Sequence, residues 1–140
     1  MLKIYLAIPY SGMEESSFEQ ANEATVALLN MGFNVFSPIT HSHPLTRHDL
    51  PGTWDFWKKI DYQFLDWCDI LLILIPKEGT EKVTQSVGVG EEVKYYSESK
   101  PPRKQIIHSC TIDNISSIKE VLDTMSLTFM INAGGENQKN

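Results

Sequence analysis

The chain has 140 residues, of which 41% are hydrophobic and 21% charged, and this predicts one globular domain with a sizeable core. Its net charge of −6 argues against a DNA or RNA backbone as main partner, because such binding uses clustered Lys and Arg. A small anion stays compatible, since backbone amides hold phosphates. Cys68 and Cys110 lack zinc or disulfide spacing and fit a cytoplasmic protein. The apolar run before Pro9 is too short for a signal peptide or a membrane span.

The first part of the chain predicts a strand, a helix and a second strand. Residues 2–8 form a buried strand that ends at Pro9. Residues 14–31 carry apolar side chains at helical spacing, and Gly32 follows as a helix stop. Residues 34–37 form the second strand. A long polar loop with three of the four histidines then covers residues 39–53, a length that is usually functional or mobile.

The rest of the chain continues this alternation. The predicted elements are, in chain order, a helix, a strand, a polar loop, a helix, a strand and a helix: 54–67, 70–75, 78–85, 88–97, 105–108 and 115–125. Residues 127–131 form a fifth strand or an extended segment docked on the domain. We expect one domain over residues 1–133 and a flexible tail over residues 134–140.

Strands that alternate with helices predict an α/β fold, here a flavodoxin- or Rossmann-like three-layer sandwich with four or five mainly parallel strands. In such sheets ligands bind beyond the carboxyl ends of the strands. Three loops reach that edge, at residues 9–12, 38–53 and 76–90. The third contains a glycine-rich stretch, Ser-Val-Gly-Val-Gly at 86–90, whose free amides can cradle a ligand beside the carboxylate of Glu92.

Four short motifs follow one another between residues 2 and 108. They are Ile4-Tyr5-Leu6-Ala7-x-Pro9-Tyr10-Ser11, then Ser37-Pro38, then Asp61 eight residues before Asp69, then Ser86-x-Gly88-Val89-Gly90-x-Glu92. Their order and spacing resemble the nucleoside 2-deoxyribosyltransferase-like superfamily, which includes 2-deoxyribosyltransferases and 2'-deoxynucleoside 5'-phosphate N-hydrolases. The last motif is most similar to the hydrolase branch. The Ser-Pro-x-x-His-x-His-Pro run at 37–44 resembles a branch of short proteins.

The resemblance implies an enzyme that cleaves the N-glycosidic bond of a nucleoside or nucleoside 5'-monophosphate, by hydrolysis or by base exchange. Glu92 is the implied nucleophile at C1', because a carboxylate nucleophile splits one hard displacement into two easier steps. Tyr5 is the implied orienting partner of Glu92, and Asp61 the carboxylate that protonates or positions the leaving base. In plainer interpretations, Glu92 is a solvated acid in the first turn of a helix and Tyr5 is an aromatic residue of the core. Asp61 is then an ordinary acid of an amphipathic helix.

The resemblance also implies which residues bind the substrate. They are Ser86, Gly88 and Gly90 in the cradle, Pro9, Tyr10, Ser11 and Gly12 in the first loop, and His41, His43 and Trp57 from the second loop and the following helix. Serine at position 86 favours a phosphorylated substrate, because the transferases carry an Asp-like residue there. The first loop lacks the arginine of the hydrolases, which weighs against a nucleoside monophosphate.

The histidines of the second loop allow a different hypothesis. His41, His43 and His48 with Asp49 form a His-x-His pattern that can chelate zinc. No cysteine joins them, and we expect neither a metal nor another cofactor. We instead expect the loop to close over the substrate, with His41 or His43 facing the base or the sugar. A plain polar surface loop is the alternative.

The expected partner is a small nucleoside or nucleotide, and neither a nucleic acid polymer nor a membrane. The resemblance implies a homodimer or a higher homo-oligomer. Two other classes of function stay open: a non-catalytic nucleotide-sensing module of the same fold, and an unrelated α/β domain in which residues 86–90 hold a phosphate. Convergence of Glu92, Asp61 and Tyr5 in one cavity would favour the enzyme.

Overall fold

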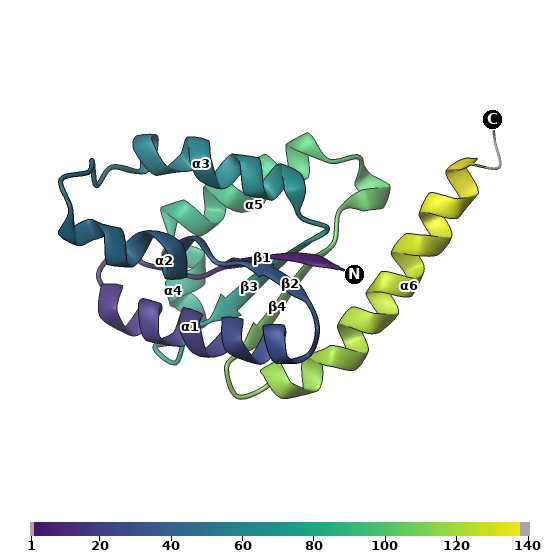
Figure 1. The fold of residues 1–140 in the computed structure, drawn as a ribbon, viewed down its shortest axis with the longest axis horizontal. Helices are drawn as coiled ribbons and strands as arrows, with labels where there is room; N and C mark the ends of the chain where they lie inside the picture. The colour runs from purple at the N-terminus through teal and green to yellow at the C-terminus, as the bar shows by residue number, and fades with distance from the viewer. Residues whose placement is uncertain (1, 138–140) are drawn as a thin grey trace.

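A parallel sheet forms the centre of the molecule in the computed structural model, which describes residues 2–137 (Figure 1). Its four strands are β1 (Lys3–Ala7), β2 (Asn34–Phe36), β3 (Ile70–Ile75) and β4 (Ile107–Thr111). They lie in the order β2-β1-β3-β4, and every neighbouring pair is parallel. The strand order therefore reverses between β1 and β3, where ligands bind in flavodoxin-like sheets. The predicted α/β class with a parallel sheet is confirmed.

Helices cover both faces of the sheet. Helices α1 (Glu14–Asn30) and α6 (Ile118–Asn137) pack on one face, and α3 (Trp54–Trp67) and α5 (Val87–Ser99) on the other (Figure 1). Side chains along β1 alternate between these faces. Ile4 and Leu6 join the core under α1, while Tyr5 and Ala7 join the core under α3 and α5. This alternation directs the ring of Tyr5 toward α5, the helix that carries Glu92.

The predicted loop over residues 39–53 is wrong in its first part. Helix α2 (Pro38–Ser42) and a 3₁₀ helix, η1 (His43–Arg47), occupy most of it. The reason is local: the Ser37 side chain caps α2 by accepting a hydrogen bond from the Thr40 amide at 3.3 Å. Proline at the first helical position has the backbone angle that a helix requires. The capping serine and the proline were not recognised as helix signals because polar residues predominate in this segment.

The predicted polar loop over residues 78–85 is also largely wrong, because α4 (Thr80–Gln85) lies there. The helix follows Gly79, whose φ of +118° suits glycine. The side chain of Glu78, just before this glycine, accepts hydrogen bonds from Ser16 and Gln20 on α1. The amide of Lys77 donates to Gln20 Oε1 at 2.8 Å. These bonds tie the start of α4 to α1.

The predicted strand over residues 127–131 is wrong, because α6 runs through it without a break. The helix begins after a short 3₁₀ turn, η3 (Ile115–Ser117), and buries Ile118 and Leu122 against the sheet. Once these residues dock, each further helical residue adds a hydrogen bond at little cost, and this overrides β propensity. Residues 134–137 of the predicted tail lie in α6, and 138–140 lie outside the described residues.

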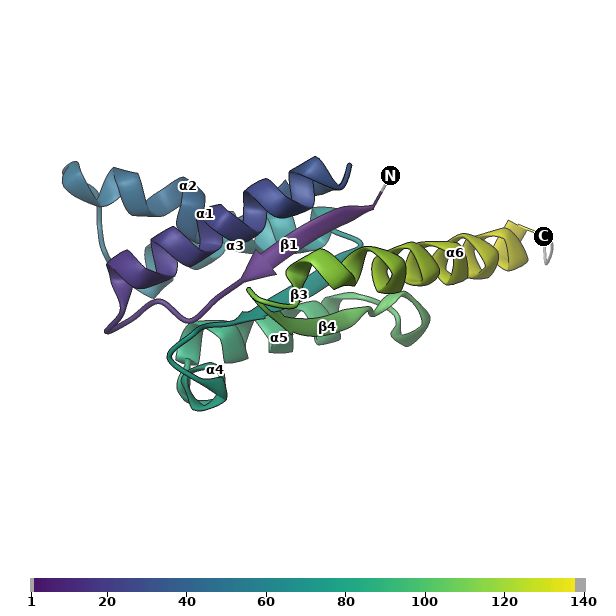
Figure 2. The ribbon, with the colours of Figure 1, turned by 90° about the horizontal axis from the view of Figure 1, so that it is seen from below.

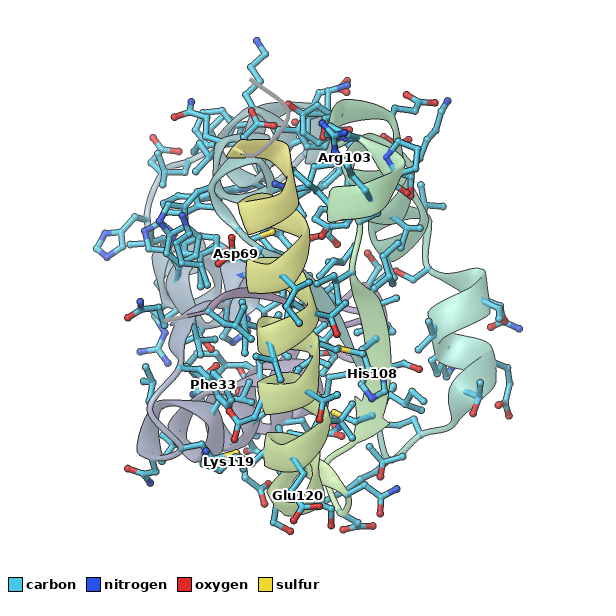
Figure 3. The ribbon with its side chains drawn as sticks, turned by 90° about the vertical axis from the view of Figure 1, so that its right-hand side faces the viewer. Phe33, Asp69, Arg103, His108, Lys119 and Glu120 are labelled. Carbon is cyan, nitrogen blue, oxygen red and sulfur yellow. The ribbon has the colours of Figure 1, made fainter. Side chains whose placement is uncertain are left out.

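The two remaining views show how α6 leaves the body of the molecule. Its first turns lie beside the sheet, and its end extends past the strands (Figure 2). The Lys119 ammonium lies 5.9 Å from the centre of the Phe33 ring near the start of the helix (Figure 3).

Strand β4 follows another short 3₁₀ turn, η2 (Pro102–Lys104), and begins at Ile107 rather than at the predicted residue 105. None of the described helices has the length and apolar character that crossing a membrane requires.

Candidate active site

A cavity of about 460 Å³ opens at the carboxyl edge of the strands, where the strand order reverses. Its size is in the range of small-molecule sites. All three predicted loops contribute to its wall, together with α3. The lining residues are Ile8, Pro9, Tyr10, Ser11, Met13, Pro38, Ile39, Ser42, Thr46, Gly52, Trp54, Trp57, Asp61, Lys82, Gln85, Ser86, Val87, Gly88, Val89 and Glu92.

Glu92 lies in the wall of this cavity and is almost completely buried, with 5% of its surface exposed. The Tyr5 hydroxyl, from β1 beneath it, donates a hydrogen bond to Glu92 Oε2. Tyr5 itself is fully buried, so its ring has one orientation. Strand β1 and helix α5 thus hold the carboxylate from below and leave it facing the cavity. The structure brings together the two residues that the motifs paired.

Asp61 reaches the same cavity from α3 and is 7% exposed. Burial raises its pKa to about 7. Burial also raises the pKa of Glu92 to about 8, with a further rise from the charge of Asp61, while the hydrogen bond from Tyr5 acts in the opposite direction. Two carboxyl groups that each gain or lose a proton near neutral pH are suited to acid–base and nucleophilic roles.

The glycine-rich stretch forms the first turn of α5. Ser86 caps this helix, because its Oγ accepts a hydrogen bond from the Val89 amide at 3.2 Å. The hydroxyl keeps its own proton to donate to a ligand. Val87 and Gly88 line the cavity, and their amides have no partner position within the helix. Gly90 is not among the cavity-lining residues, and its amide bonds to the Ser86 carbonyl.

The first loop contributes Pro9, Tyr10 and Ser11 to the cavity, as the motifs implied. Gly12 is not part of the wall. Its φ of +85° lies in the region that glycine occupies without strain, so this glycine serves the turn into α1. Pro9 and Tyr10, which do line the cavity, lie two and three residues after the end of β1.

The two expected histidines do not line the cavity. His41 is exposed and lies beside Phe36, with 5.9 Å between the ring centres. His43 hydrogen-bonds the Tyr10 hydroxyl and the Glu15 carboxylate instead. His48 and Asp49 are both exposed. Within residues 2–137, no three His, Cys, Asp or Glu side chains come together as a metal site would require.

Several lining residues lie outside the set of binding residues that the resemblance implies. Trp54 lines the cavity beside Trp57, and its indole N–H donates to Glu91 Oε2 at 2.9 Å. The spacing of the two tryptophans, three residues apart on a helix, indicated a shared face. Lys82 and Gln85 reach the wall from α4. They were missed because a loop was predicted there, and a loop assigns no direction to a side chain.

Comparison with known proteins supports the fold and the superfamily. Among solved structures, the chain is similar to a 2-deoxyribosyltransferase from the psychrotolerant bacterium Bacillus psychrosaccharolyticus, with 28% sequence identity and a TM-score of 0.52. The match covers 78% of this chain and 73% of that chain. The fold and the similarity support the deoxyribosyltransferase-like superfamily that the motifs resemble. The chain belongs to the family DUF1937, a domain of unknown function, which matches residues 2–104. None of the curated proteins matches it.

Proposed function

We propose that this protein is an enzyme that cleaves the N-glycosidic bond of a nucleoside or nucleoside 5'-monophosphate, with Glu92 as nucleophile. The observation that carries the proposal is the buried contact between Tyr5 and Glu92 at a cavity that also contains Asp61. Burial of a carboxylate costs free energy, so stability alone does not explain why Glu92 is buried. The similarity to a 2-deoxyribosyltransferase supports the same class of chemistry.

The proposed reaction has two steps that both pass through Glu92. The ionised carboxylate forms a bond to C1' of the sugar, and the C1'–N bond breaks with its electron pair leaving on the base. Protonated Asp61 gives its proton to the departing base. Water, or the ring nitrogen of a second base, then bonds to C1' as the bond to Glu92 breaks and leaves Glu92 as a carboxylate, and the Asp61 carboxylate takes up the proton that the acceptor loses. Hydrolysis and base exchange differ only in this acceptor.

The walls of the cavity support a substrate with a flat aromatic base. Trp54 and Trp57 come from α3, the helix that also carries Asp61. Glu91 holds the Trp54 indole through its N–H, which keeps the ring in one position. A planar base between these rings would lie beside Asp61, where a proton donor to the base is needed.

The groups at the start of helix α5 support a phosphate group on the substrate. Ser86 and the first amides of α5 provide hydrogen-bond donors, and the helix N-terminus favours a negative charge. The first loop has no arginine, and Lys82 on α4 lies in the cavity wall where a positive charge is useful. We therefore include the 5'-monophosphates among the proposed substrates.

The direct test is release of free base, followed by liquid chromatography, from a panel of ribo- and deoxyribonucleosides and their 5'-monophosphates. Each substrate is assayed with and without a second base, which separates hydrolysis from transfer. We expect release from at least one class and at least a thousandfold loss in Glu92→Gln. Glu98→Gln, an exposed acid on the same helix, is the matched control. Binding without release would indicate the sensing module instead.

We also propose that the protein forms a homo-oligomer in a reducing compartment. Leu127 and Ile131 on α6 are 59% and 65% exposed, which is costly for a helix that extends from the body. Both cysteines are buried free thiols. Light scattering after gel filtration measures the mass, and a monomer at micromolar concentration would contradict the oligomer.

A further inference from the structure

A chain of hydrogen bonds leads from the cavity to the surface through His43, which is distant in sequence from its two partners near the N-terminus. The Tyr10 hydroxyl, in the loop after β1, lies 2.7 Å from His43 Nδ1 in η1. The other ring nitrogen, His43 Nε2, lies 2.9 Å from Glu15 Oε1 in the first turn of α1. Tyr10 belongs to the cavity wall, and neither of the other two residues does.

The imidazole in the middle of this chain is held firmly. The side chain of His43 is 12% exposed, whereas that of Glu15 is 77% exposed. The ring of Phe18 stacks on the imidazole with 4.5 Å between centres, and the ring of Tyr10 meets it edge-on at 5.7 Å. Aromatic contacts on two sides leave the ring one orientation, so its two nitrogens keep their separate partners.

These partners determine the direction of each hydrogen bond. The Glu15 carboxylate only accepts, so Nε2 of His43 carries a proton and donates it. Nδ1 of the neutral ring is then the acceptor, and the Tyr10 hydroxyl donates to it. Burial, and then the charges of Glu14 and Glu15, raise the pKa of Tyr10, so the phenol keeps its proton at neutral pH. With its own proton engaged, the phenol oxygen is left as an acceptor.

The position of Tyr10 indicates which part of a substrate it meets. Asp61, Trp54 and Trp57 occupy the α3 side of the cavity, where the proposed function places the base. Tyr10 comes from the loop between β1 and α1, and α1 packs on the face of the sheet opposite to α3. A nucleoside with its base on the α3 side extends its sugar toward Tyr10. The groups of a sugar that donate hydrogen bonds are its hydroxyls.

We infer that Tyr10 is a specificity residue that accepts a hydrogen bond from a free hydroxyl of the substrate sugar, and that His43 and Glu15 are positioning residues for it. This inference rests on the proposed function, since it takes the substrate to be a nucleoside or nucleotide. It also gives the segment 43–47 a role in the site although the histidine itself stays outside the cavity.

The test combines Tyr10→Phe with removal of single hydroxyls from the substrate. A nucleoside that the wild-type protein cleaves is compared with its 3'-deoxy and 5'-deoxy analogues. For the wild type, we expect one analogue to lose about three- to tenfold in kcat/KM, the effect of one neutral hydrogen bond. In Tyr10→Phe this discrimination should vanish, while the analogue itself is cleaved as well as by the wild type.

The positioning residues have a separate readout. His43→Gln and Glu15→Gln should weaken the same discrimination, mainly through KM, and His48→Gln, an exposed histidine directly after this segment, should leave it unchanged. The ¹⁵N spectrum of the wild-type imidazole at pH 8 should show a protonated Nε2 and a bare Nδ1. If Tyr10→Phe fails to fold, these two variants and the spectrum decide.

The outcomes separate this inference from the proposed function. A wild-type protein that cleaves no substrate contradicts the proposed function and, with it, this inference. A wild-type protein that cleaves nucleosides, with equal discrimination in Tyr10→Phe, overturns only the role of Tyr10. Equal discrimination in His43→Gln and Glu15→Gln, together with a protonated Nδ1, overturns the positioning roles.

Discussion

Glu92 is buried in a way that favours its neutral form, while the reaction proposed for it requires the anion. With a pKa raised to about 8, about a tenth of the carboxyl groups are ionised at pH 7. The hydrogen bond from Tyr5 is the contact that counteracts burial and the charge of Asp61. The Tyr5 hydroxyl therefore affects both the orientation of the nucleophile and the fraction that is ready to react.

Removal of this donor provides a prediction at the scale of one residue. In Tyr5→Phe the pKa of Glu92 should rise further, because the anion loses the hydrogen bond that stabilises it. Because the reaction needs Glu92 ionised and Asp61 protonated, and the pKa of Glu92 is the higher of the two, the alkaline limb of kcat/KM against pH should then move to higher pH and the plateau should fall, with more than a tenfold loss at pH 7. Tyr95→Phe, which loses a hydroxyl bonded to Asp66 on the outside of the molecule, should leave the profile unchanged. An unshifted alkaline limb in Tyr5→Phe would show that Tyr5 only fills space.

Trp54 allows a second prediction at this scale. If its indole stacks on the base, Trp54→Ala should raise KM by about five- to 150-fold, since stacking of a base on an aromatic ring contributes roughly 1–3 kcal/mol. Glu91→Ala should have a smaller effect of the same kind, because the indole N–H loses its acceptor. Trp67→Ala, on the end of α3 away from the cavity, is the control. Equal KM values in all three variants would contradict stacking.

At the scale of elements, the short helices around the cavity depend on contacts that the local sequence does not display. Helix α4 has six residues and buries none of them. Its anchor is the side chain of Gln20 on α1, which donates to Glu78 and accepts from the Lys77 amide. Helices of this length are unstable alone. The direction of Lys82 thus follows from a residue about 60 positions earlier in the chain.

Loss of this anchor should be visible in stability and in local dynamics. Gln20 is 4% exposed, and Gln20→Ala removes both bonds, which should lower the free energy of unfolding by about 1–3 kcal/mol in urea titrations. Amide exchange over residues 77–85 should accelerate more than exchange in β1. Glu23→Ala, an exposed change on the same helix, should alter neither. Uniformly faster exchange would mean that the anchor is not local.

At the scale of the whole molecule, the two carboxyl groups of the cavity link stability to pH. In the folded protein the pKa of Glu92 is about 8 and that of Asp61 about 7, against 4.5 and 3.8 without the fold. Between these values the folded state binds more protons than the unfolded chain. Stability therefore falls as pH rises from about 4 to about 8, and this cost is absent below that interval and complete above it.

The double variant Glu92→Gln, Asp61→Asn removes this cost and should be more stable than the wild type at high pH. The difference in the free energy of unfolding should be near its minimum at pH 4 and grow to roughly 3 kcal/mol or more at pH 9. Urea titrations at several pH values measure it. A difference that stays constant with pH, or that shrinks as pH rises, would mean that the carboxyl groups are not buried as described.

The sequence by itself determined the alternation of strands and helices, and its motifs predicted three residues that the structure brings together at the cavity. Residues 54–67 and 70–75 were predicted to the residue, because hydrophobic periodicity and the polar residues around it are local properties. Glu92, Asp61 and Tyr5 could be predicted because the spacing of a motif is read directly from the amino-acid sequence. Alternation along β1 also directs Tyr5 to the face of the sheet that α5 covers.

Only the tertiary structure decided which further residues join the cavity wall beside those that the motifs implied. Helices occupy most of two segments that were predicted as polar loops, and Lys82 on one of these helices lines the cavity. His43 hydrogen-bonds Tyr10 and Glu15 and does not line the cavity. The physical reason is the same each time. The partner of a polar side chain is selected by which distant segments pack together, and residues 28 to about 60 positions apart become neighbours only after the sheet has formed.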